Sequence, residues 1–451
     1  MSENIKENKM GVMPVTKLLL NMSLPIMLSM LVMACYNIVD SIFVAQINEN
    51  ALTAISLAFP VQTLMIAVSI GTAIGVNALL AMKLGQKDSD AVNKIAINGL
   101  FLSVCSFIAF FILGFLFTKP YLKTQTGDEQ IIQFGSEYLK IITMASFALF
   151  VSTMSDRLLQ ATGRTFYTMI TQLVGAITNI ILDPLMIFGI GPFPKMGMAG
   201  AAWATVIGQI LSALVSLYFN LKKNPDIHFK LKGFKPDSLI IGQIYKIGIP
   251  SILLQSINSV TTYGMNLILG TFSATAIAVY GVYFKLNSFI FMPVFGLTTG
   301  MVPIVSYNYG AGNAERIKKT VKSTILIAVS IMIFGIIIFE LFPAELLMLF
   351  KASEHMLGIG CTAMRIIAPS FIGAAIAITL GSTFQALGKS FLSMTVSFVR
   401  QLVVLLPVAY FLSRSGKLEN VWFCFLVAEI FAISLSLFFM QRIKKTMLDK
   451  L

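Results

Sequence analysis

The chain has 451 residues, of which 57% are hydrophobic and only 12% are charged, and its mean hydropathy is +0.84. A soluble domain carries roughly 25% charged residues, so this composition excludes an ordinary globular protein of the aqueous phase. The formal charge of +13 does not indicate nucleic-acid binding, because the basic residues fall between apolar blocks, as loop charges of a membrane protein do.

Long apolar blocks recur along the chain and predict membrane-spanning helices. Blocks such as 101–117 and 421–440 approach or reach the roughly 20 residues that cross a bilayer. Backbone groups in lipid must be paired internally, and apolar runs without period-two alternation favour helices over a barrel. In chain order we expect spans at 16–45, 51–81, 95–117, 131–156, 165–190, 198–221, 240–271, 275–306, 317–342, 356–386, 390–412 and 420–441.

The basic residues predict the orientation of these spans. The N-terminus, the even-numbered loops with the span ends beside them, and the C-terminal tail hold 23 of the 33 Lys and Arg residues, whereas the odd-numbered loops hold six. By the positive-inside rule both termini are expected in the cytoplasm, which requires an even number of spans. The protein is therefore expected to be a multi-pass protein of the cell membrane, with the lipid bilayer as a partner and no nucleic-acid partner.

An internal repeat divides the chain at a polar linker, 223–239, into an N-lobe, 1–222, and a C-lobe, 240–451. A shift of 225 residues aligns these pairs without a gap: Pro25 with Pro250, Gly71 with Gly296, Gly75 with Gly300, Gly85 with Gly310, and Gln160-Ala161 with Gln385-Ala386. Repeated Gly and Pro residues predict that the same bends and close helix contacts recur. The expected fold class is all-α, with twelve transmembrane helices in two pseudo-symmetric six-helix bundles of the same orientation.

Two carboxylates fall inside predicted spans, where ionisable groups are expensive and usually functional. Asp40 follows Tyr36 and Asn37 on one helix face, and Asp183 follows Asn179 by four residues. Each group could hold a proton or a small cation such as Na⁺. Each carboxylate also has a structural alternative. Asp40 could face water at the end of its helix. Asp183 and Asn179 could be a polar pair that hydrogen-bonds to the backbone groups left unpaired by the proline that follows Asp183.

The carboxylates do not follow the repeat. The shift places Met265 opposite Asp40 and Val408 opposite Asp183, so we expect cation coupling in the N-lobe alone. The C-lobe is expected to offer a more apolar, amide-rich cavity wall from Gln255, Ser256, Asn258, Met265 and Asn266. Lys285, Arg400 and Glu429 also fall inside predicted spans, where they could line the substrate cavity or form structural pairs as buried charges.

Other chemistry has little support in the sequence. The four cysteines are scattered singly in apolar segments and the two histidines fall in expected loops, so neither a metal site nor a catalytic centre is indicated. We therefore expect no enzyme and no cofactor beyond the coupling ion. Asp156, at the end of a predicted span, is expected to be solvated or to cap a helix.

The motifs resemble the MATE (multidrug and toxic compound extrusion) family over nearly all of the chain. They are Asn37-Ile-Val-Asp40-Ser-Ile-Phe-Val-Ala, 51–60, 71–85, Gln160-Ala-Thr-Gly-Arg, Asn179-Ile-Ile-Leu-Asp183-Pro and 197–205. The resemblance implies a MATE/MOP-type fold, and export of drugs and other organic, often cationic, lipophilic compounds in exchange for inward H⁺ or Na⁺. It also implies that Asp40 takes a proton, with Tyr36, Asn179 and Asp183 as its neighbours in the N-lobe.

The sequence departs from sodium-coupled NorM-type members, which carry acids where this chain has Asn258 and Ala374. This difference favours a bacterial DinF-like or MepA-like branch and coupling through the N-lobe, with protons as the first choice. Separately, we expect the protein to function as a monomer. The alternatives are a lipid-linked saccharide flippase of the same superfamily and, in another class, a channel. Few buried basic residues argue against the flippase, and the absence of a filter sequence argues against the channel.

Overall fold

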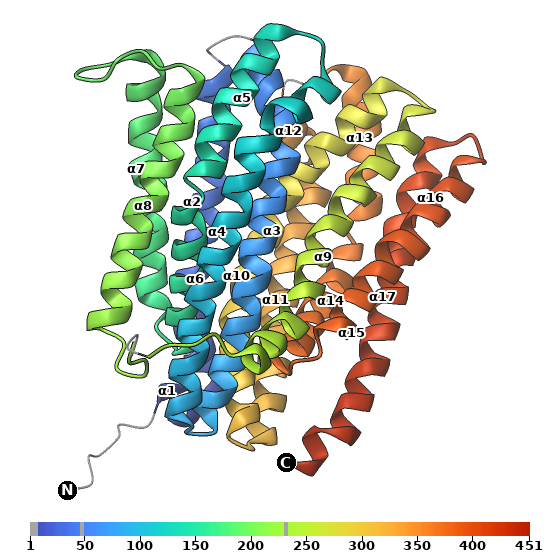
Figure 1. Ribbon diagram of the computed structural model, residues 1–451. Coiled ribbons are helices and arrows are strands. Elements are labelled where there is room, and N and C mark those ends of the chain that lie inside the picture. Colours follow the sequence, from blue (N-terminus) through green and yellow to red (C-terminus); the bar gives the residue numbers. More distant parts are fainter. Residues whose placement is uncertain (1–7, 46–48, 230–232, 351) are drawn as a thin grey trace, which may run out of the picture. The chain divides into compact units, whose positions relative to one another are not determined.

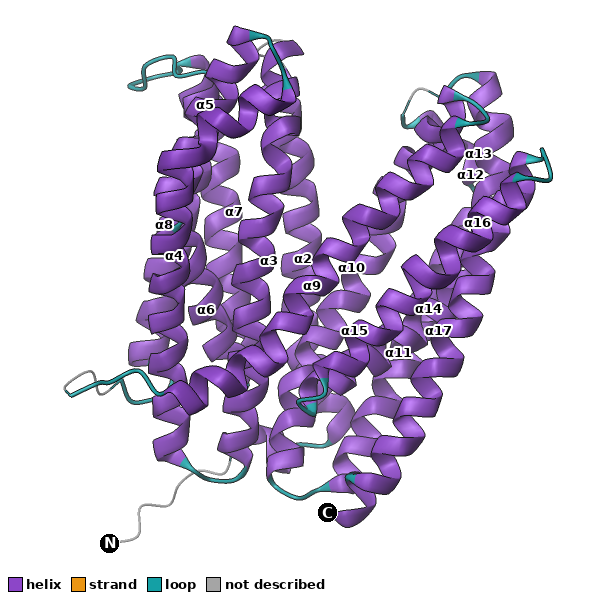
Figure 2. Cartoon of the chain, turned by 45° about the vertical axis from the view of Figure 1, so that its right-hand side comes forward, coloured by secondary structure: helices purple, strands orange, loops and turns teal. Residues whose placement is uncertain are grey.

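The computed structural model describes residues 8–45, 49–229, 233–350 and 352–451, apart from the side chains of residues 37–42, 44, 45, 49 and 52. These residues form helices joined by short turns, with no strand among them (Figure 2). Ten helices are long and apolar enough to cross a membrane, and two bent helix pairs raise the number of spans to as many as twelve. The predicted all-α architecture is confirmed.

The helices follow the predicted spans closely along the chain (Figure 1). In order they are α1 (Lys9–Val12), α2 (Val15–Ala45), α3 (Glu49–Gly85), α4 (Ser89–Gln125), α5 (Glu129–Met144), α6 (Phe147–Ala161), α7 (Thr165–Phe188), α8 (Met198–Lys222), α9 (Ser238–Gly270), α10 (Ala274–Gly310), α11 (Ala314–Leu341), α12 (Pro343–Met348), α13 (Glu354–Ile367), α14 (Ser370–Ala386), α15 (Ser390–Phe398), the π-helix η1 (Val399–Leu405), α16 (Leu406–Ser413), α17 (Leu418–Thr446) and the short 3₁₀ turn η2 (Leu448–Lys450).

Three of the predicted spans are interrupted. The fourth bends by 46° between α5 and α6, and the tenth bends by 51° between α13 and α14, so the break recurs in the repeat. Pro369 stands at the second break, where its ring and missing N–H prevent the helix from continuing. The eleventh span passes through η1, in which each turn holds an extra residue.

The helices form two compact units, which we call unit 1 (Met1–Met27 with Pro250–Leu451) and unit 2 (Leu28–Ile249). The borders of these units differ from the division of the sequence into lobes. The first part of α2 packs in unit 1, and the first part of α9 packs in unit 2. Both helices change unit beside the prolines of the repeat, Pro25 and Pro250. Each unit is thus completed by a segment from the other half of the sequence.

In unit 1, the first part of α2 lies on two glycines of α10. A Cβ atom built on Gly300 would lie 2.4 Å from Ser23 Oγ and 2.8 Å from Ser23 Cα, and one on Gly296 would lie 2.7 Å from Met27 Cα. Ser23 Oγ also donates a hydrogen bond to the carbonyl of Leu297, at 3.1 Å. The two helices can approach this closely only because both positions lack a side chain.

Unit 2 repeats this contact with the equivalent glycines. A Cβ atom on Gly75 of α3 would lie 2.3 Å from the carbonyl oxygen of Ile244 of α9, and one on Gly248 would lie 2.9 Å from the carbonyl oxygen of Gly71. Ile244 is fully buried in a core cluster that also contains Val76. The glycines that align at an offset of 225 residues therefore lie at equivalent close helix contacts in the two units.

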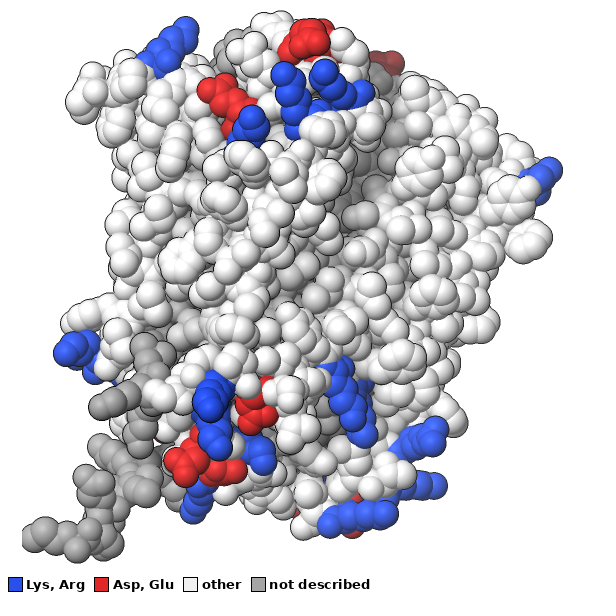
Figure 3. All heavy atoms as spheres, viewed as in Figure 1, with Lys and Arg blue, Asp and Glu red and all other residues white. Residues whose placement is uncertain are grey.

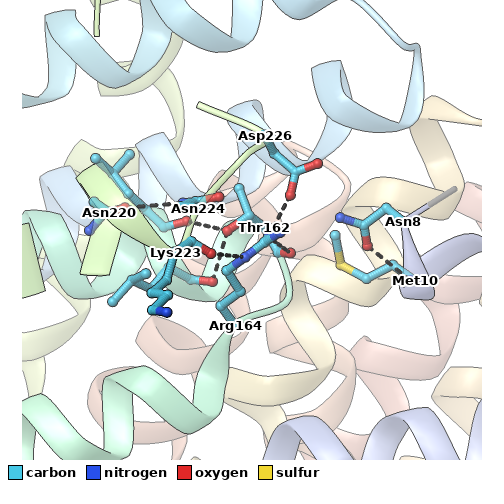
Figure 4. Close-up of polar contacts among 10 residues, drawn as sticks. Asn8, Met10, Thr162, Arg164, Asn220, Lys223, Asn224 and Asp226 are labelled. Atoms are coloured by element: carbon cyan, nitrogen blue, oxygen red, sulfur yellow. Dashed lines mark hydrogen bonds and ion pairs between the residues drawn. The ribbon is translucent and has the colours of Figure 1, made fainter. Parts of the chain in front are cut away.

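The segment between α8 and α9 is fastened to unit 2. Figure 4 shows Arg164 between Thr162, Lys223 and Asp226. Its Nε donates to the Lys223 carbonyl at 2.9 Å, and its Nη1 donates to the Thr162 carbonyl at 3.0 Å and pairs with the Asp226 carboxylate. Ile227, 4% exposed, joins the same core cluster as Ile244. These contacts hold the segment that leads into α9 close to unit 2.

On the face drawn in Figure 3, Lys, Arg, Asp and Glu gather mostly near the two ends, and the described residues between them are largely uncharged. Large exposed apolar side chains of single helices, such as Phe115 of α4 and Leu214 of α8, contribute to the surface. Such a surface needs a hydrocarbon environment, in agreement with the length and hydropathy of the helices.

The glycine contacts generate a stability prediction. Gly75→Ala forces a methyl group against the Ile244 carbonyl, and overpacking of this kind costs about 1–3 kcal/mol. We expect Gly75→Ala to lower the thermal unfolding temperature of the purified protein. Gly242→Ala, on α9 where an added Cβ meets nothing within 4 Å, is the matched control and should leave it unchanged or slightly raised. Equal unfolding temperatures for the two variants would contradict the contact.

The Arg164 contacts predict protection from proteolysis. Arg164→Gln removes the pairing with Asp226, so limited trypsin digestion should cut residues 223–239 several times faster than in the wild type. Lys83→Gln, which removes a more exposed pair with Asp88 at 4.0 Å, is the control and should leave the cutting rate unchanged. An unchanged rate in Arg164→Gln would show that this arginine does not hold the segment.

Candidate functional site

The predicted pair Asn179 and Asp183 lies inside unit 2, one turn apart on α7. Asp183 is fully buried and Asn179 is 2% exposed. With the amide oriented to satisfy its neighbours, Asn179 Nδ2 donates to Asp183 Oδ2 at 3.0 Å. The sequence spacing thus correctly placed the two side chains together on one helix face.

Thr205 of α8 completes this group. Asn179 Oδ1 accepts hydrogen bonds from Thr205 Oγ1 at 3.2 Å and from Thr205 N at 3.1 Å. The helices can come this close because α8 has small residues above and below Thr205. A Cβ on Gly208 would lie 2.7 Å from the Gly175 carbonyl oxygen, and one on Gly200 would lie 2.6 Å from the Met186 carbonyl oxygen. We call Asp183, Asn179 and Thr205 the α7–α8 site.

Thr205 is the last residue of the 197–205 motif, but the sequence alone predicts no role for it. The signal was present in the spacing, since glycines at 200 and 208 flank it on one face of α8 and mark a close helix contact. The α7–α8 site presents carboxylate, amide and hydroxyl oxygens, which are the atoms that hard cations prefer. The carboxylate can alternatively hold a proton. No group of three or more His, Cys, Asp or Glu side chains suited to a metal occurs among the described residues.

The first-helix candidates are only partly described. Tyr36 is half-buried on α2 in unit 2. Asn37 and Asp40 belong to the same helix, but their side chains lie outside the described residues. Their predicted part in coupling therefore stays a prediction.

A further buried carboxylate belongs to unit 2. Asp156, expected to be solvated or capping, is 6% exposed because α6 continues beyond it to Ala161. Its Oδ1 accepts from Thr171 Oγ1 at 2.6 Å, and its Oδ2 accepts from Gln172 Nε2 at 3.4 Å. The expectation was wrong, because the predicted span ended five residues too early.

The charged candidates of the second half divide into a pair and a separate lysine. Arg400 Nη1 donates to Glu429 Oε1 at 2.9 Å, so these two residues are partners. Lys285 was expected to be buried. It is exposed, with its Nζ 5.9 Å from the centre of the Phe350 ring, a cation–π distance.

The amide-rich wall predicted on α9 is not uniform. Asn258 is exposed, and Gln255 and Asn266 are half-buried, so these amides remain partly accessible. Met265 is fully buried in unit 1 and packs as a core residue instead of lining a cavity. The side chains that were predicted to form a common cavity wall therefore lie on different sides of α9.

Comparison with known proteins identifies the family. The MatE family model matches residues 25–185 and 250–411, two stretches that begin 225 residues apart. The multidrug export protein MepA of Staphylococcus haemolyticus is 26% identical over 431 residues, which covers 95% of this chain and 94% of that protein. MepA of Staphylococcus aureus is 25% identical over 418 residues and covers 92% and 91%.

Solved structures match the fold along almost the whole chain. A crystal structure of MATE in complex with MaL6 has a TM-score of 0.92 at 23% identity, covering 99% of this chain and 100% of that one. A MOP superfamily transporter from Pyrococcus furiosus has a TM-score of 0.91 at 23% identity, covering 97% and 98%. Both the sequence matches and the shared twelve-helix fold lead to one conclusion: the chain belongs to the MatE family of multi-pass membrane transporters, which are not enzymes.

Proposed function

We propose that this protein is a secondary active multidrug exporter, which exchanges organic and often cationic lipophilic compounds for inward H⁺ or Na⁺ by alternating access. The observation that carries the proposal is the buried carboxylate of the α7–α8 site inside a membrane span. The full-length similarity to proteins named multidrug export protein MepA supports the substrate class.

Coupling follows from the cost of a charge in the membrane. An ionised carboxylate inside a bilayer is costly, up to about 2.5–3.5 kcal/mol at the bilayer centre on insertion scales, and binding of a proton or a cation removes this cost. Asn179 donates a hydrogen bond to the ionised form of Asp183, so the carboxylate keeps a hydrogen-bond partner after it releases the ion. A group that is neutral with the coupling ion and charged without it can make the protein's conformations depend on the ion.

Protons are the first choice of coupling ion, and sodium at the same carboxylates is the alternative. Thr205 Oγ1 and Asn179 Oδ1 would contribute neutral oxygens to a bound Na⁺, whereas a proton needs only the carboxylate. We expect a protein that works as a monomer in the cell membrane with both termini in the cytoplasm. The excess of basic residues on one set of loops supports this orientation.

Asp183→Asn tests the coupling role. The amide keeps the shape of the side chain but cannot ionise, so gradient-driven dye export from inverted membrane vesicles should fall to the background of empty membranes. The exposed residue Asp90 gives the control Asp90→Asn, which should retain wild-type export. Full export by Asp183→Asn, with equal protein in the membrane, would refute the assignment.

The coupling ion is tested in the same vesicles with the pH gradient and the sodium gradient imposed separately. We expect the pH gradient alone to drive saturable dye export. Export that follows the sodium gradient and ignores the pH gradient would overturn the choice of protons and favour Na⁺ at the α7–α8 site.

Thr205→Val removes the hydroxyl with little change of shape. The partner of this hydroxyl in the site is the neutral amide of Asn179, and a hydrogen bond between neutral groups is worth about 0.5–1.5 kcal/mol. The concentration of the coupling ion that gives half-maximal export should therefore rise by about two- to tenfold. Thr446→Val, at the exposed end of α17, is the control. An unchanged half-maximal concentration in Thr205→Val would show that Thr205 does not contribute to binding of the coupling ion.

A further inference from the structure

The ion pair of unit 1 lies near the middle of two spans. Arg400 is ten residues beyond the start of α15, and Glu429 is eleven residues beyond the start of α17. At 1.5 Å per residue, each lies about 15–17 Å from the end of its span, half of a hydrocarbon core of about 30 Å. The side chains keep only 21% and 13% of their surface exposed. Charges at this depth are costly and usually functional.

The surrounding helices are shaped to hold the pair. Arg400 lies on η1, and its neighbour Gln401 accepts a hydrogen bond from Thr261 of α9 at 2.9 Å. On the other side, a Cβ atom at Gly373 of α14 would lie 2.9 Å from Glu429 Cβ, so a glycine is needed for the approach. Single π-helical turns of this kind are frequent at functional sites. Two adjacent residues of η1 thus connect to α9 and α17.

The pair has hydrogen-bonding capacity left over. Glu429 Oε2 is buried and has no hydrogen-bond partner among the described residues. Arg400 has five N–H groups, of which Nη1 alone donates to another group in the part of the chain that the structure describes. Buried ion pairs are favourable only when additional hydrogen bonds satisfy their remaining atoms. The pair therefore presents one unused acceptor and several unused donors.

The neighbourhood adds no net charge. The phenol of Tyr283, on α10, lies within electrostatic range of both members, and its ring lies 5.9 Å from that of Phe425, centre to centre. The helix that carries Gly373 has no titratable side chain along Ser370–Ala386. The pair is thus electrically neutral in an aromatic environment. The α7–α8 site differs, because its carboxylate is bonded to a neutral amide.

We propose that the Arg400–Glu429 pair is a binding site for zwitterionic solutes, a substrate class of the exporter proposed above. The cationic group of the solute would donate to Glu429 Oε2, and its anionic group would accept from the free N–H groups of Arg400. A solute with both charges leaves no uncompensated charge in the apolar interior, whereas a simple cation or anion would leave one. The inference rests on the proposed function for its transport step but not for binding.

Two rhodamine dyes test this inference, one with a free carboxylate beside its cationic ring system and the other its methyl ester, which is a simple cation. Binding to the purified protein is measured by fluorescence anisotropy, and export is measured in vesicles. The double variant Arg400→Gln/Glu429→Gln removes both charges together and leaves none unpaired. We expect it to weaken binding and export of the carboxylate dye at least about tenfold and to change those of the ester by less than about twofold.

The matched control is Arg365→Gln/Glu340→Gln, which removes a more exposed ion pair of the same unit, 57% and 40% exposed. It should affect neither dye. The exchanged pair Arg400→Glu/Glu429→Arg keeps the site neutral and should retain binding of the carboxylate dye better than the double Gln variant. Thermal unfolding shows whether each variant is folded, and a double Gln variant that unfolds leaves the exchanged pair to decide.

Equal losses for both dyes in the double Gln variant would make the pair structural and overturn the inference. Unchanged binding of the carboxylate dye would also overturn it. If the wild type exports the ester but neither binds nor exports the carboxylate dye, the inference fails and the proposed function stands. If the wild type binds the carboxylate dye but exports neither dye, the proposed export function fails for these dyes, and the binding comparison still decides the site.

Discussion

The close contact between a helix backbone and a pair of glycines, made once in each unit, is the constraint on which the rest of the structure depends. Unit 1 receives the first part of α2 on Gly296 and Gly300, and unit 2 receives the first part of α9 beside Gly71 and Gly75. A side chain at Gly75, Gly296 or Gly300 would meet backbone atoms of the neighbouring helix, and one at Gly248 would meet the Gly71 carbonyl. Two continuous helices, α2 and α9, therefore contribute residues to both units.

This exchange gives the prolines a structural meaning. Pro25 and Pro250 lie inside α2 and α9, at the points where these helices pass from one unit to the other. Proline removes a backbone hydrogen bond inside a helix and so allows it to bend there. The repeat preserves these positions together with the glycines, because the packing of each unit requires both.

The scaffold repeats, but the polar chemistry placed on it does not. In unit 2, Asp183 accepts a hydrogen bond from the neutral amide of Asn179, which suits a group that gains and loses a cation. In unit 1, the equivalent pair of helices carries Arg400 and Glu429, whose charges cancel. The sequence predicts cation coupling in the N-lobe alone, and this stays a prediction. Glu429, an acid inside a predicted span of the second half, is paired with Arg400.

Much of the fold could be predicted because its signals are local. Hydropathy locates the spans, and the repeat is visible in Gly and Pro residues. The direction of single side chains could not be predicted, because a uniformly apolar helix gives no moment that separates core from lipid. Lys285 and Met265 were misplaced for this reason. The pairing of Arg400 with Glu429 could not be predicted, because the two residues lie on different helices and spacing along the sequence does not fix the register between helices. Thr205 was not predicted for the same reason, since it contacts Asn179 on the neighbouring helix.

Cross-linking of cysteine pairs in native membranes with a short bifunctional thiol reagent tests the exchange most directly. In a background without the four native cysteines, the pair Ser23→Cys/Leu297→Cys should cross-link within unit 1, because Ser23 donates a hydrogen bond to the Leu297 carbonyl. The pair Thr72→Cys/Tyr245→Cys should cross-link within unit 2, because the Tyr245 side chain reaches Thr72. The pair Ser23→Cys/Gly281→Cys, with the second cysteine elsewhere on α10, should remain unlinked. Efficient linking of the first two pairs alone is the predicted result. Failure of both, or linking no greater than that of the third pair, would contradict the exchange of α2 and α9 between the units.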